Sequence, residues 1–368
     1  MARLAVLGGG QLGRLLAEAA DALGIPAACF DLDPACSASR ACEVVRGSFD
    51  DADAVRRFAE GAAAVTCEWE SVPLSALVAA GSVAPLRPGV ASFAAARDRF
   101  AEQDCFAHAG VRAPESLRVS RASDLPEAFE RLGSPVVLKS RFGGYDGKGQ
   151  ARLARGDDPG EVFDRLGVSE VLAQAFVGFE REVSVVGCRG ADGDFVAFDP
   201  IENEHRGGIL YRSLAPAVGL SWERRSELER ATRAIADDLG HVGVLAVEFF
   251  LTADGVLANE IAPRVHNSGH WTLGSGLTSQ FEQHVRAVLG RPLARAGGRC
   301  WGGMINLVGV VPDGVEELAG RPGVDVRLYG KEPRPGRKLG HVSVHAETET
   351  VRDDLLKRVT DAVEWSVV

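Results

Sequence analysis

Residues 244–272 read VLAVEFFLTADGVLANEIAPRVHNSGHWT, and the rest of the chain can be interpreted from this stretch outward. Two runs of strand-forming residues in it, VLAVEFFL and VLANEI, flank a short Ala-Asp-Gly segment. An Asp-Gly pair between two such runs predicts a β-hairpin. With the turn centred on Asp254, the pattern predicts that Glu248 and Glu260 lie opposite each other on the two strands.

The two glutamates of this hairpin need a partner, because like charges directly opposite each other destabilise paired strands. Convergent carboxylates suit a divalent cation that also carries phosphate oxygens. The alternative is that one glutamate turns into solvent and nothing binds. The segment after Glu260 favours the cation, because it gathers cationic and amide side chains in one glycine-containing turn: Arg264, His266, Asn267 and His270. The sequence therefore predicts a metal–nucleotide site beside an anion site.

Length and composition exclude several classes of protein. Of the 368 residues, 46% are hydrophobic and 25% charged, the balance of a soluble globular protein with two or three domains. No apolar run approaches the roughly 18 residues of a transmembrane helix. The formal net charge of -10 disfavours a nucleic-acid surface but permits local basic pockets. We therefore expect no nucleic-acid or membrane partner.

The cysteines and the N-terminus indicate the compartment. The seven cysteines are odd in number and scattered, and none forms a Cys-x-x-Cys pair. This pattern argues against a disulfide framework or a zinc site and for a reducing environment. The N-terminus, MARLAVLGGG, lacks the long apolar core and cleavage site of a signal peptide. We therefore expect a cytoplasmic protein whose chain begins with a buried strand.

The start of the chain has a βαβ pattern. Residues 2–7 are a predicted strand, 14–23 an amphipathic helix and 27–33 a second strand, with the glycine turn 8–13 between strand and helix. The turn fits the G-x-G-x-x-G dinucleotide fingerprint, although glycines there can also simply let a helix begin close to a sheet. A nicotinamide cofactor stays open at this point.

A further strand is predicted at 63–67, and it is followed by Glu68 and Glu70. Ligands collect at the carboxyl edge of a parallel sheet, so these acids mark a candidate binding edge. The Rossmann-like unit ends near residues 97–99, where a helix that runs to about Ala109 begins.

Residues 113–177 have the pattern of a small α+β module. We predict helices at 122–132 and 159–166 and strands at 135–139, 150–153 and 170–174. The loop FGGYDGKGQ at 142–150 holds four glycines and a lysine, so its backbone N–H groups and one charge can cover phosphates. It does not meet the Walker A pattern, and the alternative is a flexible hairpin tip. Lys139 ends an apolar strand, where a lysine is rarely buried without an anion, and a nucleotide phosphate would supply one.

The chain after residue 177 is again predicted to be α+β. Residues 199–210 are interpreted as a polar loop that carries His205 and Arg206. Helices are expected on both sides of the acidic hairpin, at 223–239 and 278–289. Residues 329–338, YGKEPRPGRK, place lysines and arginines in a Gly/Pro-rich loop. In an acidic protein this loop is a candidate anion pocket, the alternative being an ordinary solvated loop.

Eight stretches of the chain carry a family resemblance when they are taken in order. They are VLGGGQLGR (6–14), FGGYDGKGQ (142–150), FEREVSVVG (179–187), ENEHRGGIL (202–210), VEFF (247–250), NEIAPRVHNSGHWT (259–272), SQFEQHVRA (279–287) and LYGKEPRPGRKLGHV (328–342). Together they resemble the N5-carboxyaminoimidazole ribonucleotide synthases, a family of ATP-grasp enzymes in purine biosynthesis. The resemblance extends from the first strand to about Val342, and GGYDGKGQ and NEIAPR-x-HNSGHWT are its most specific blocks. With it, the first glycine turn stops being a reason to expect a nicotinamide.

The resemblance implies a mixed α/β and α+β architecture, the ATP-grasp fold. A Rossmann-like N-terminal (pre-ATP-grasp) domain would span residues 1–98 and a small lid subdomain with its linker helix residues 99–177. The large subdomain and the C-terminal region would span residues 178–368. The resemblance also implies a homodimer.

The family's reaction combines ATP, bicarbonate and 5-aminoimidazole ribonucleotide in steps. Bicarbonate attacks the γ-phosphate to give carboxyphosphate, which releases CO2 in a closed site, and the exocyclic amine of the ribonucleotide captures the CO2 as a carbamate. The implied cofactors are ATP and Mg2+, or Mn2+ in its place. Phosphoryl transfer of this kind needs mainly positioning and charge neutralisation, which the charged residues of the motifs can provide.

Roles for individual residues follow from the resemblance. Glu248 and Glu260 would hold the metal on the triphosphate. ATP would be bound by Arg99, Lys139, Gly144, Gly147, Lys148, Gly149, Gln150, Gln174, Ala175, Phe176, Val177, Glu182, His205, Asn259 and Glu260. The catalytic residues would be Arg264, His266 and Asn267, which orient bicarbonate, and Asp146, which orients the attacking amine or accepts its proton. The ribonucleotide would be held by Gln11, Leu12, Glu70, Tyr145, Asp146, Lys331 and Arg337, with the last two on its 5′-phosphate.

Three places depart from the family pattern. Gln174 stands where the family often has glutamate, and its amide oxygen can still accept from the adenine amine. Val265 replaces a usual proline, which frees φ in the bicarbonate loop. The segment 66–72 keeps two acids but varies around them, and no motif follows Val342.

Three other functions fit parts of the sequence. A formate-using glycinamide ribonucleotide transformylase shares the scaffold but not the NSGHWT ending. A nicotinamide-dependent oxidoreductase would account for the first glycine turn but not for the carboxylate hairpin. A non-catalytic nucleotide sensor would have no need of the charges in the bicarbonate loop.

Overall fold

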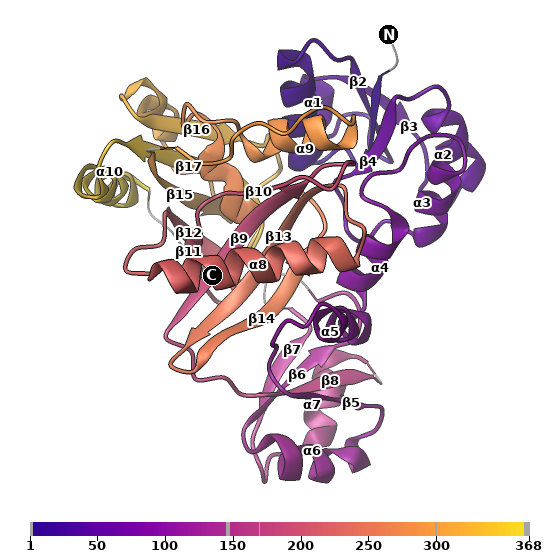
Figure 1. Ribbon diagram of the computed structural model, residues 1–368, viewed down its shortest axis with the longest axis vertical. Coiled ribbons are helices and arrows are strands. Elements are labelled where there is room, and N and C mark those ends of the chain that lie inside the picture. The colour runs from indigo at the N-terminus through magenta and orange to yellow at the C-terminus, as the bar shows by residue number, and fades with distance from the viewer. Residues whose placement is uncertain (1–2, 145–147, 169, 299, 364–368) are drawn as a thin grey trace.

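The computed structural model of the chain describes residues 3–144, 148–168, 170–298 and 300–363. Its strands form three sheets, seen in Figure 1 as an N-terminal unit at the upper right, a long sheet through the middle and a small unit at the bottom. Over these residues, no helix is both long and apolar enough to cross a membrane.

The N-terminal sheet is parallel, with its strands in the order β3-β2-β1-β4. Side chains of β1 alternate between two hydrophobic clusters, so the sheet is covered on both faces, as a Rossmann-like unit requires. Its elements are β1 (Leu4–Leu7), α1 (Gln11–Ala22), β2 (Ala27–Asp31), η1 (Ser37–Arg40), β3 (Glu43–Arg46), α2 (Ala52–Ala59), β4 (Ala64–Cys67), α3 (Leu74–Gly81) and α4 (Val90–Arg97).

The predicted start of the first helix, at residue 14, was wrong. The turn is only three residues long, and α1 begins at Gln11. Gly8 has a φ of +104°, which favours glycine, and this reverses the chain quickly enough for the helix to start at once.

The small sheet is antiparallel, in the order β5-β8-β6-β7, and it shares one hydrophobic core with two helices. Its elements are β5 (Ser116–Val119), η2 (Ala122–Asp124), α6 (Leu125–Leu132), β6 (Val136–Ser140), β7 (Gln150–Leu153), α7 (Pro159–Leu166) and β8 (Val171–Ala175). Helix α5 (Arg99–His108) precedes it and leads over from the N-terminal unit. The predicted helix at 159–166 and strand at 150–153 are confirmed, and the other two predicted strands lie one residue later.

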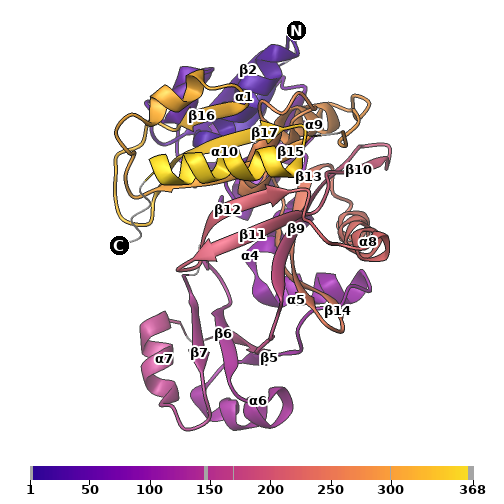
Figure 2. The same cartoon turned by 90° about the vertical axis from the view of Figure 1, so that its left-hand side faces the viewer.

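The long sheet has nine strands, in the order β14-β13-β9-β11-β12-β15-β17-β16, with β10 paired to β9. Its strands are β9 (Arg181–Arg189), β10 (Phe195–Ala197), β11 (Ile201–Arg206), β12 (Ile209–Ala215), β13 (Gly243–Thr252), β14 (Gly255–Ala262), β15 (Trp301–Val308), β16 (Val324–Leu328) and β17 (Lys338–Ala346). The associated helices are α8 (Trp222–Asp238), η3 (Asn267–Thr272), α9 (Gln280–Val288), η4 (Val315–Gly320) and α10 (Glu349–Ala362). Helix α10 packs on β15 and β17, as Figure 2 shows.

The predicted polar loop at 199–210 was wrong, because most of it forms the hairpin of β11 and β12. The turn falls on Gly207 and Gly208, both with positive φ. Polar side chains are tolerated inside because they bond to one another. Asn203 donates to Ser184 Oγ (2.9 Å) and accepts from Ser213 Oγ (2.9 Å).

The acidic hairpin has the predicted pairing, but a β-bulge produces it. Near the tip, Thr252 pairs with Gly255 and Phe249 with Ala258, which would place Glu248 opposite Asn259. The register shifts by one residue there, so that Glu248 pairs with Glu260. A bulge of this kind leaves the extra residue, Asn259, without a partner in the ladder and re-aims its side chain.

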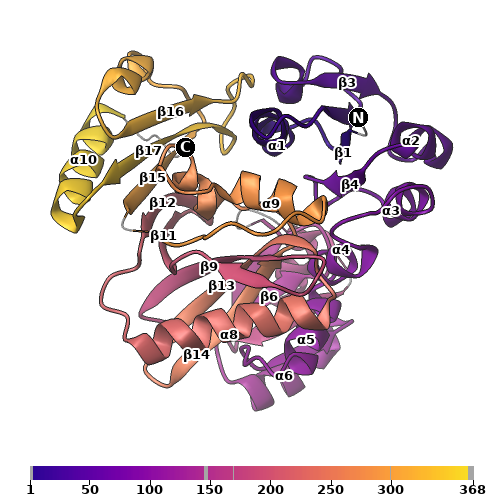
Figure 3. The same ribbon diagram turned by 45° about the horizontal axis from the view of Figure 1, so that its top comes forward.

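Helix α9 joins the N-terminal unit to the long sheet, and Figure 3 shows it between α1 and β9. His284 on this helix accepts a hydrogen bond from the Val244 N–H of β13 (3.0 Å). Its other ring nitrogen, Nε2, lies 2.7 Å from Thr66 Oγ1 of β4. One buried side chain thus ties the two sheets together.

Candidate active site

The two glutamates of the hairpin converge at one end of the long sheet. They are Cα partners across β13 and β14, and the side chain of Glu248 keeps 21% of its exposure. Burial and the neighbouring Glu260 carboxylate raise the pKa of Glu248 to about 7. A nearby cation would stabilise the charged form of this carboxylate. The sequence predicts such a cation between the two glutamates.

Arg99 compensates part of this negative charge. It lies at the start of α5, and its guanidinium bonds both Glu260 Oε2 and Glu102 Oε2, each at 2.8 Å. Glu102 is fully buried and also accepts from the Ile261 N–H (2.9 Å). Arg99 therefore holds the acidic strand β14 against the helix that leads to the small sheet.

Lys139 extends from β6 of the small sheet to the bulged residue of the hairpin. Its Nζ donates to Asn259 Oδ1 at 2.8 Å, and the side chain is buried. Burial and the positive charge of Arg99 lower the pKa of Lys139 to about 8. The bulge thus has a chemical use, because it brings an amide to a buried lysine beside the two acids.

Glu182 and His205 form a second pair on the same sheet. Glu182 lies on β9 and His205 on the neighbouring β11, and Glu182 Oε2 is 2.7 Å from His205 Nδ1. Burial alone would lower the pKa of His205, but the bond to Glu182 and the charge of Glu248 raise it. These two residues are therefore placed together as predicted, within electrostatic range of the acidic hairpin.

The segment after β14 approaches both the acids and the N-terminal unit. Arg264 NH2 lies 2.9 Å from Glu70 Oε1, which connects this segment to the end of β4. His266 Nε2 is 3.5 Å from Glu248 Oε1. Burial and the charge of Arg264 hold the pKa of His266 well below its usual value, so the ring is neutral at pH 7.

Asn267 is unusual among the residues of this loop. Both its side-chain oxygen and its side-chain nitrogen are buried and have no hydrogen-bond partner in the described part of the chain. Buried amides are normally bonded, because an unpaired one costs about 1–3 kcal/mol. A polar ligand at this position would satisfy both atoms.

Gln280 shapes the loop, although no sequence pattern singled it out. It is fully buried; Oε1 accepts from the His266 N–H (2.8 Å), and Nε2 donates to the His266 carbonyl (2.6 Å). The same amide lies 3.2 Å from His270 Nδ1. His270 is itself buried and packs on His341, so it supports the loop from within the core.

The first glycine turn is explained by Glu68. This buried carboxylate accepts from the Gly10 N–H (2.7 Å), and burial raises its pKa. A Cβ on Gly10 would lie 2.7 Å from Glu68 Oε1, and one on Gly13 would lie 2.5 Å from the Gly8 carbonyl oxygen. The glycines thus let a helix begin close to a sheet and an acid, which was the alternative to a dinucleotide site.

The Gly/Pro-rich loop of residues 329–338, the basic loop, reaches this same turn. Lys331 Nζ donates to Gln11 Oε1, while Arg337 NH1 donates to the Glu332 carbonyl (3.1 Å). Leu12 is different, because its side chain is buried in the hydrophobic core, which leaves its backbone for any substrate contact. Lys338, the last residue of this loop, lies close enough to His205 and Glu248 to influence their pKa values.

The predicted phosphate loop is described in part. Tyr145, Asp146 and Gly147 lie outside the described residues. The side chains of Lys148 and Gln150 are exposed, and a Cβ on Gly149 would lie 2.3 Å from Ser140 Oγ. The close backbone approach that the glycines were expected to allow is therefore found against β6.

The end of β8, predicted to hold adenine, combines a buried amide with open side chains. Gln174 is buried, and its Nε2 has no partner within the described residues. Ala175 ends the strand, Phe176 is 47% exposed and Val177 follows. An adenine edge would satisfy the amide, and the departure from glutamate at this position leaves a donor as well as an acceptor.

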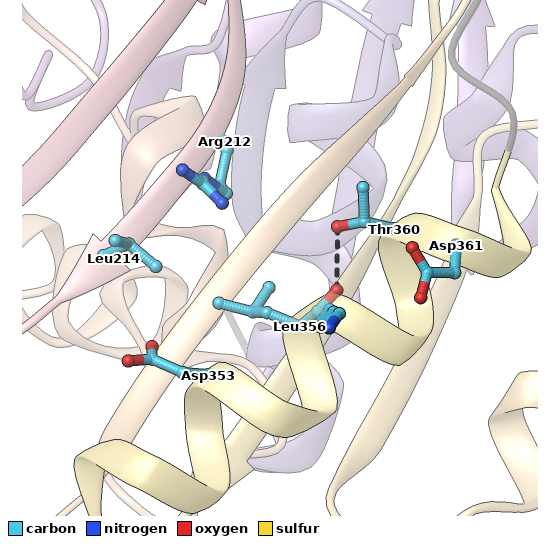
Figure 4. Close-up of a pocket in the computed structure, with 7 residues that line it drawn as sticks. Arg212, Leu214, Asp353, Leu356, Thr360 and Asp361 are labelled. Atoms are coloured by element: carbon cyan, nitrogen blue, oxygen red, sulfur yellow. Dashed lines mark hydrogen bonds between the residues drawn. The ribbon is translucent and has the colours of Figure 1, made fainter.

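Two pockets of the described residues lie away from this site. One of about 210 Å³ opens between β12 and α10, where Figure 4 shows Arg212 and Leu214 facing Asp353 and Asp361. Another, of about 230 Å³, lies beside α8 and is lined in part by Phe198 and Trp222. Neither includes a predicted site residue.

A metal must be judged from the two hairpin acids. The described residues contain no group of three or more His, Cys, Asp or Glu side chains that could hold a metal ion on their own. Mg2+ bound with a nucleotide needs only one or two carboxylates, because phosphate oxygens and water supply the remaining ligands. Opposed Glu248 and Glu260 fit this kind of ion.

Comparison with known proteins assigns the chain to one family along nearly its whole length. Family models match three consecutive parts: a ribonucleotide synthetase preATP-grasp domain at residues 1–97, an ATP-grasp domain at 104–281 and a phosphoribosylaminoimidazole carboxylase C-terminal domain at 303–354. The predicted ATP-grasp fold, with a pre-ATP-grasp N-terminal domain and a C-terminal domain, is confirmed.

Two curated relatives from different bacteria share one name. The N5-carboxyaminoimidazole ribonucleotide synthase of Pseudomonas aeruginosa is 37% identical, over 98% of this chain and 99% of its own. The enzyme of the same name from Bacillus subtilis is 35% identical, over 97% of this chain and 94% of its own. These relatives do not favour the formate-using transformylase.

Solved structures agree with the sequence relatives. N5-carboxyaminoimidazole ribonucleotide synthetase from Thermus thermophilus has a TM-score of 0.93 and 40% identity, covering 99% of both chains. The Aspergillus clavatus synthase, solved with ADP and 5-aminoimidazole ribonucleotide, has a TM-score of 0.91 and 29% identity, covering 99% of this chain and 98% of its own. The chain described here belongs to the N5-carboxyaminoimidazole ribonucleotide synthase family of ATP-grasp ligases.

Proposed function

We propose that this protein carboxylates 5-aminoimidazole ribonucleotide on its exocyclic amine, using ATP and bicarbonate, in purine biosynthesis. The observation that carries the proposal is the 3.5 Å approach of His266 Nε2 to Glu248 Oε1. It joins the loop suited to a small anion to the acids suited to a metal-bound triphosphate. A phosphoryl group bound at the acids would therefore lie next to bicarbonate.

ATP would occupy the space between the small sheet and the acidic hairpin. Lys139, Arg99 and the glycine loop would neutralise its phosphates, and Glu182 would accept from the ribose hydroxyls. Glu248 and Glu260 would hold Mg2+, or Mn2+, which supplies positive charge to the β- and γ-phosphate oxygens when bound. Gln174 would accept from the adenine amine at the end of β8.

Bicarbonate would be activated in the loop after β14. Arg264 would orient it for attack on the γ-phosphate, together with the amide of Asn267, which has no partner among the described residues. The Nδ1 of the neutral His266 ring accepts from the Ser268 N–H (3.3 Å), so its Nε2 can donate one hydrogen bond. The products would be ADP and carboxyphosphate. Closure of the small sheet over the site would exclude water, which hydrolyses carboxyphosphate.

The ribonucleotide would lie between the N-terminal unit and the basic loop. Lys331 and Arg337 would bind its 5′-phosphate, with Gln11 and Glu70 beside them. Tyr145 and Asp146 would complete the site, and Asp146 would orient the amine or take its proton. The amine would then capture CO2 released from carboxyphosphate.

The remaining predictions belong to the same proposal. We propose the functional units as residues 1–98, 99–177 and 178–368, acting as a cytoplasmic homodimer. The first two bounds fall near the ends of α4 and β8, where one sheet gives way to the next. Size-exclusion chromatography with light scattering would test the dimer.

The decisive test is phosphate release from MgATP and bicarbonate, measured with and without 5-aminoimidazole ribonucleotide. We expect strong stimulation by the ribonucleotide, accompanied by loss of its free amine. ATP turnover that is indifferent to it would move the proposal to another acceptor, with glycinamide ribonucleotide tried first. Absence of turnover with either acceptor would favour a nucleotide sensor.

A further inference from the structure

Two cysteines of the N-terminal unit lie within reach of each other. Cys29 on β2 and Cys42, just before β3, have their Sγ atoms 3.5 Å apart. Cys29 pairs with Val44 in the parallel ladder, so Cys42, two residues before Val44, extends to the same face of the sheet. Both are free thiols in the structure.

The two thiols differ in their access to solvent. Cys29 is fully buried in the hydrophobic cluster between β2 and α1, whereas Cys42 is partly exposed at its edge. The contact with Cys29 lowers the pKa of Cys42, and the same contact together with burial raises the pKa of Cys29. One partly exposed sulfur with a lowered pKa therefore lies beside one buried thiol.

We propose that Cys29 and Cys42 are an oxidant-sensitive dithiol that closes to a disulfide with hydrogen peroxide as oxidant. A disulfide needs the sulfurs about 2.05 Å apart, so they must approach by roughly 1.5 Å. Cys42 lies outside regular secondary structure, after η1, and can make that movement. A metal is a poorer use of the pair, since the described residues hold no suitable cluster of ligands.

The reaction balances without a further reagent. The Cys42 thiolate attacks one oxygen of peroxide, the O–O bond breaks, and hydroxide leaves as the sulfur becomes a sulfenic acid. The Cys29 sulfur then attacks the Cys42 sulfur, and its proton leaves with the hydroxyl as water. The two thiols lose two electrons and peroxide is reduced to water.

The segment between these cysteines touches the basic loop. Ser37 Oγ donates to the Tyr329 carbonyl (3.0 Å), and the Ala38 N–H donates to the Gly9 carbonyl (2.9 Å). A Cβ on Gly330 would lie 2.3 Å from the Arg40 guanidinium, which shows how closely the two segments pack. Pulling Cys42 toward Cys29 should therefore disturb the loop that presents Lys331. This second step rests on the proposed function of that loop.

The test is peroxide titration of the full-length protein, followed by alkylation and peptide mass spectrometry. We expect one disulfide, between Cys29 and Cys42, that a thiol reductant reverses. Cys42→Ser should prevent it, and Cys36→Ser, in the same segment, is the matched control that should leave it unchanged. Because Cys42 is the outer member of the pair, its serine variant avoids placing a hydroxyl in the core, which Cys29→Ser would do.

Kinetics on the same samples test the link to the site. Oxidation should raise the KM for the ribonucleotide several-fold while leaving the KM for ATP unchanged, and Cys42→Ser should abolish the difference. No Cys29–Cys42 linkage, or a Cys36–Cys42 linkage instead, would overturn the proposal. A linkage without kinetic effect would overturn the link to the basic loop. The disulfide map is independent of turnover, so it remains decisive if the ribonucleotide is not the substrate.

Discussion

Glu248 faces Glu260 only because Asn259 is an extra residue in β14. The bulge does two things at once, since it opposes two carboxylates and gives the buried Lys139 an amide to bond. As a result, Glu248, Glu260 and the Lys139 side chain bound to Asn259 lie together at the bulge, where they suit a phosphorylated ligand with its metal ion. Bulges are common beside active sites for this reason.

The opposed acids predict the effect of removing one charge. Glu260→Gln should abolish turnover, because the amide binds Mg2+ poorly and weakens the bond from Arg99, while the far-ultraviolet circular dichroism stays native. The matched control is Glu282→Gln on α9, whose carboxylate pairs with Arg286 at the surface and should not affect turnover. Near-normal activity of Glu260→Gln at ordinary Mg2+ would remove this residue from the metal site.

The basic loop predicts a selective change in substrate affinity. Lys331→Ala should raise the KM for the ribonucleotide much more than the KM for ATP. The reason is that Lys331 contacts Gln11 in the N-terminal unit, where the ribonucleotide is proposed to bind. Arg334→Ala, an exposed position in the same loop, controls for a general loss of positive charge. Equal effects on both substrates would place the function of this loop elsewhere.

The amide of Asn267, which has no partner among the described residues, predicts that one substitution lowers activity without lowering stability. Asn267→Ala removes two buried polar atoms that lack partners among the described residues, so the Tm should stay the same or rise. Bicarbonate-dependent phosphate release should fall at least about tenfold, the loss expected for one well-placed hydrogen bond to a charged group. A large drop in Tm would show that the amide has a structural partner, and unchanged turnover would exclude it from the bicarbonate site.

His284 predicts how stability depends on pH. Nδ1 accepts from the Val244 N–H, so the ring is neutral, and burial lowers its pKa to about 3. Between this value and the usual 6.5 the unfolded chain binds a proton that the folded chain does not, so stability falls as pH falls below 6.5. At about 1.4 kcal/mol per pH unit, this one residue should contribute a loss of about 2 kcal/mol by pH 5.

The measurement is urea unfolding at pH 7 and pH 5. His284→Gln should be less stable at pH 7 but should lose less stability on acidification than the parent protein. His108→Gln, at an exposed position on α5, is the control and should keep the parent dependence. The prediction fails if the parent and His284→Gln lose the same free energy of unfolding between the two pH values.

Local patterns predicted the elements that depend on neighbouring residues. The hairpin at Asp254, helix α7 and the basic loop follow from alternation, caps and turn residues within a few positions. The polar hairpin of β11 and β12 was missed because Asn203 is satisfied by serines on two other strands, which no local pattern shows. The acids were paired correctly although the bulge itself was not foreseen.

Contacts between distant segments could not be predicted from the residues alone. Arg99 and Glu260 are separated by 161 positions, and the resemblance to a family was needed to place both at the nucleotide. Gln280 carries no charge and stands within an ordinary helical pattern, so its bonds to His266 gave no signal. Glu68 was visible as an acid at a strand end, but its packing against the glycine turn required coordinates.

The buried rings between the basic loop and the loop after β14 have a consequence for how the proposed reaction would use ATP. His341 packs on His270, which Gln280 connects to the bicarbonate loop, and its Nδ1 lies 2.7 Å from the hydroxyl of Tyr329 in the basic loop. If the basic loop binds the ribonucleotide as proposed, a movement of this loop would be transmitted through these packed rings to the loop after β14, the proposed bicarbonate site. An enzyme built in this way is expected to split little ATP while its acceptor is scarce, and so to consume energy in step with purine synthesis.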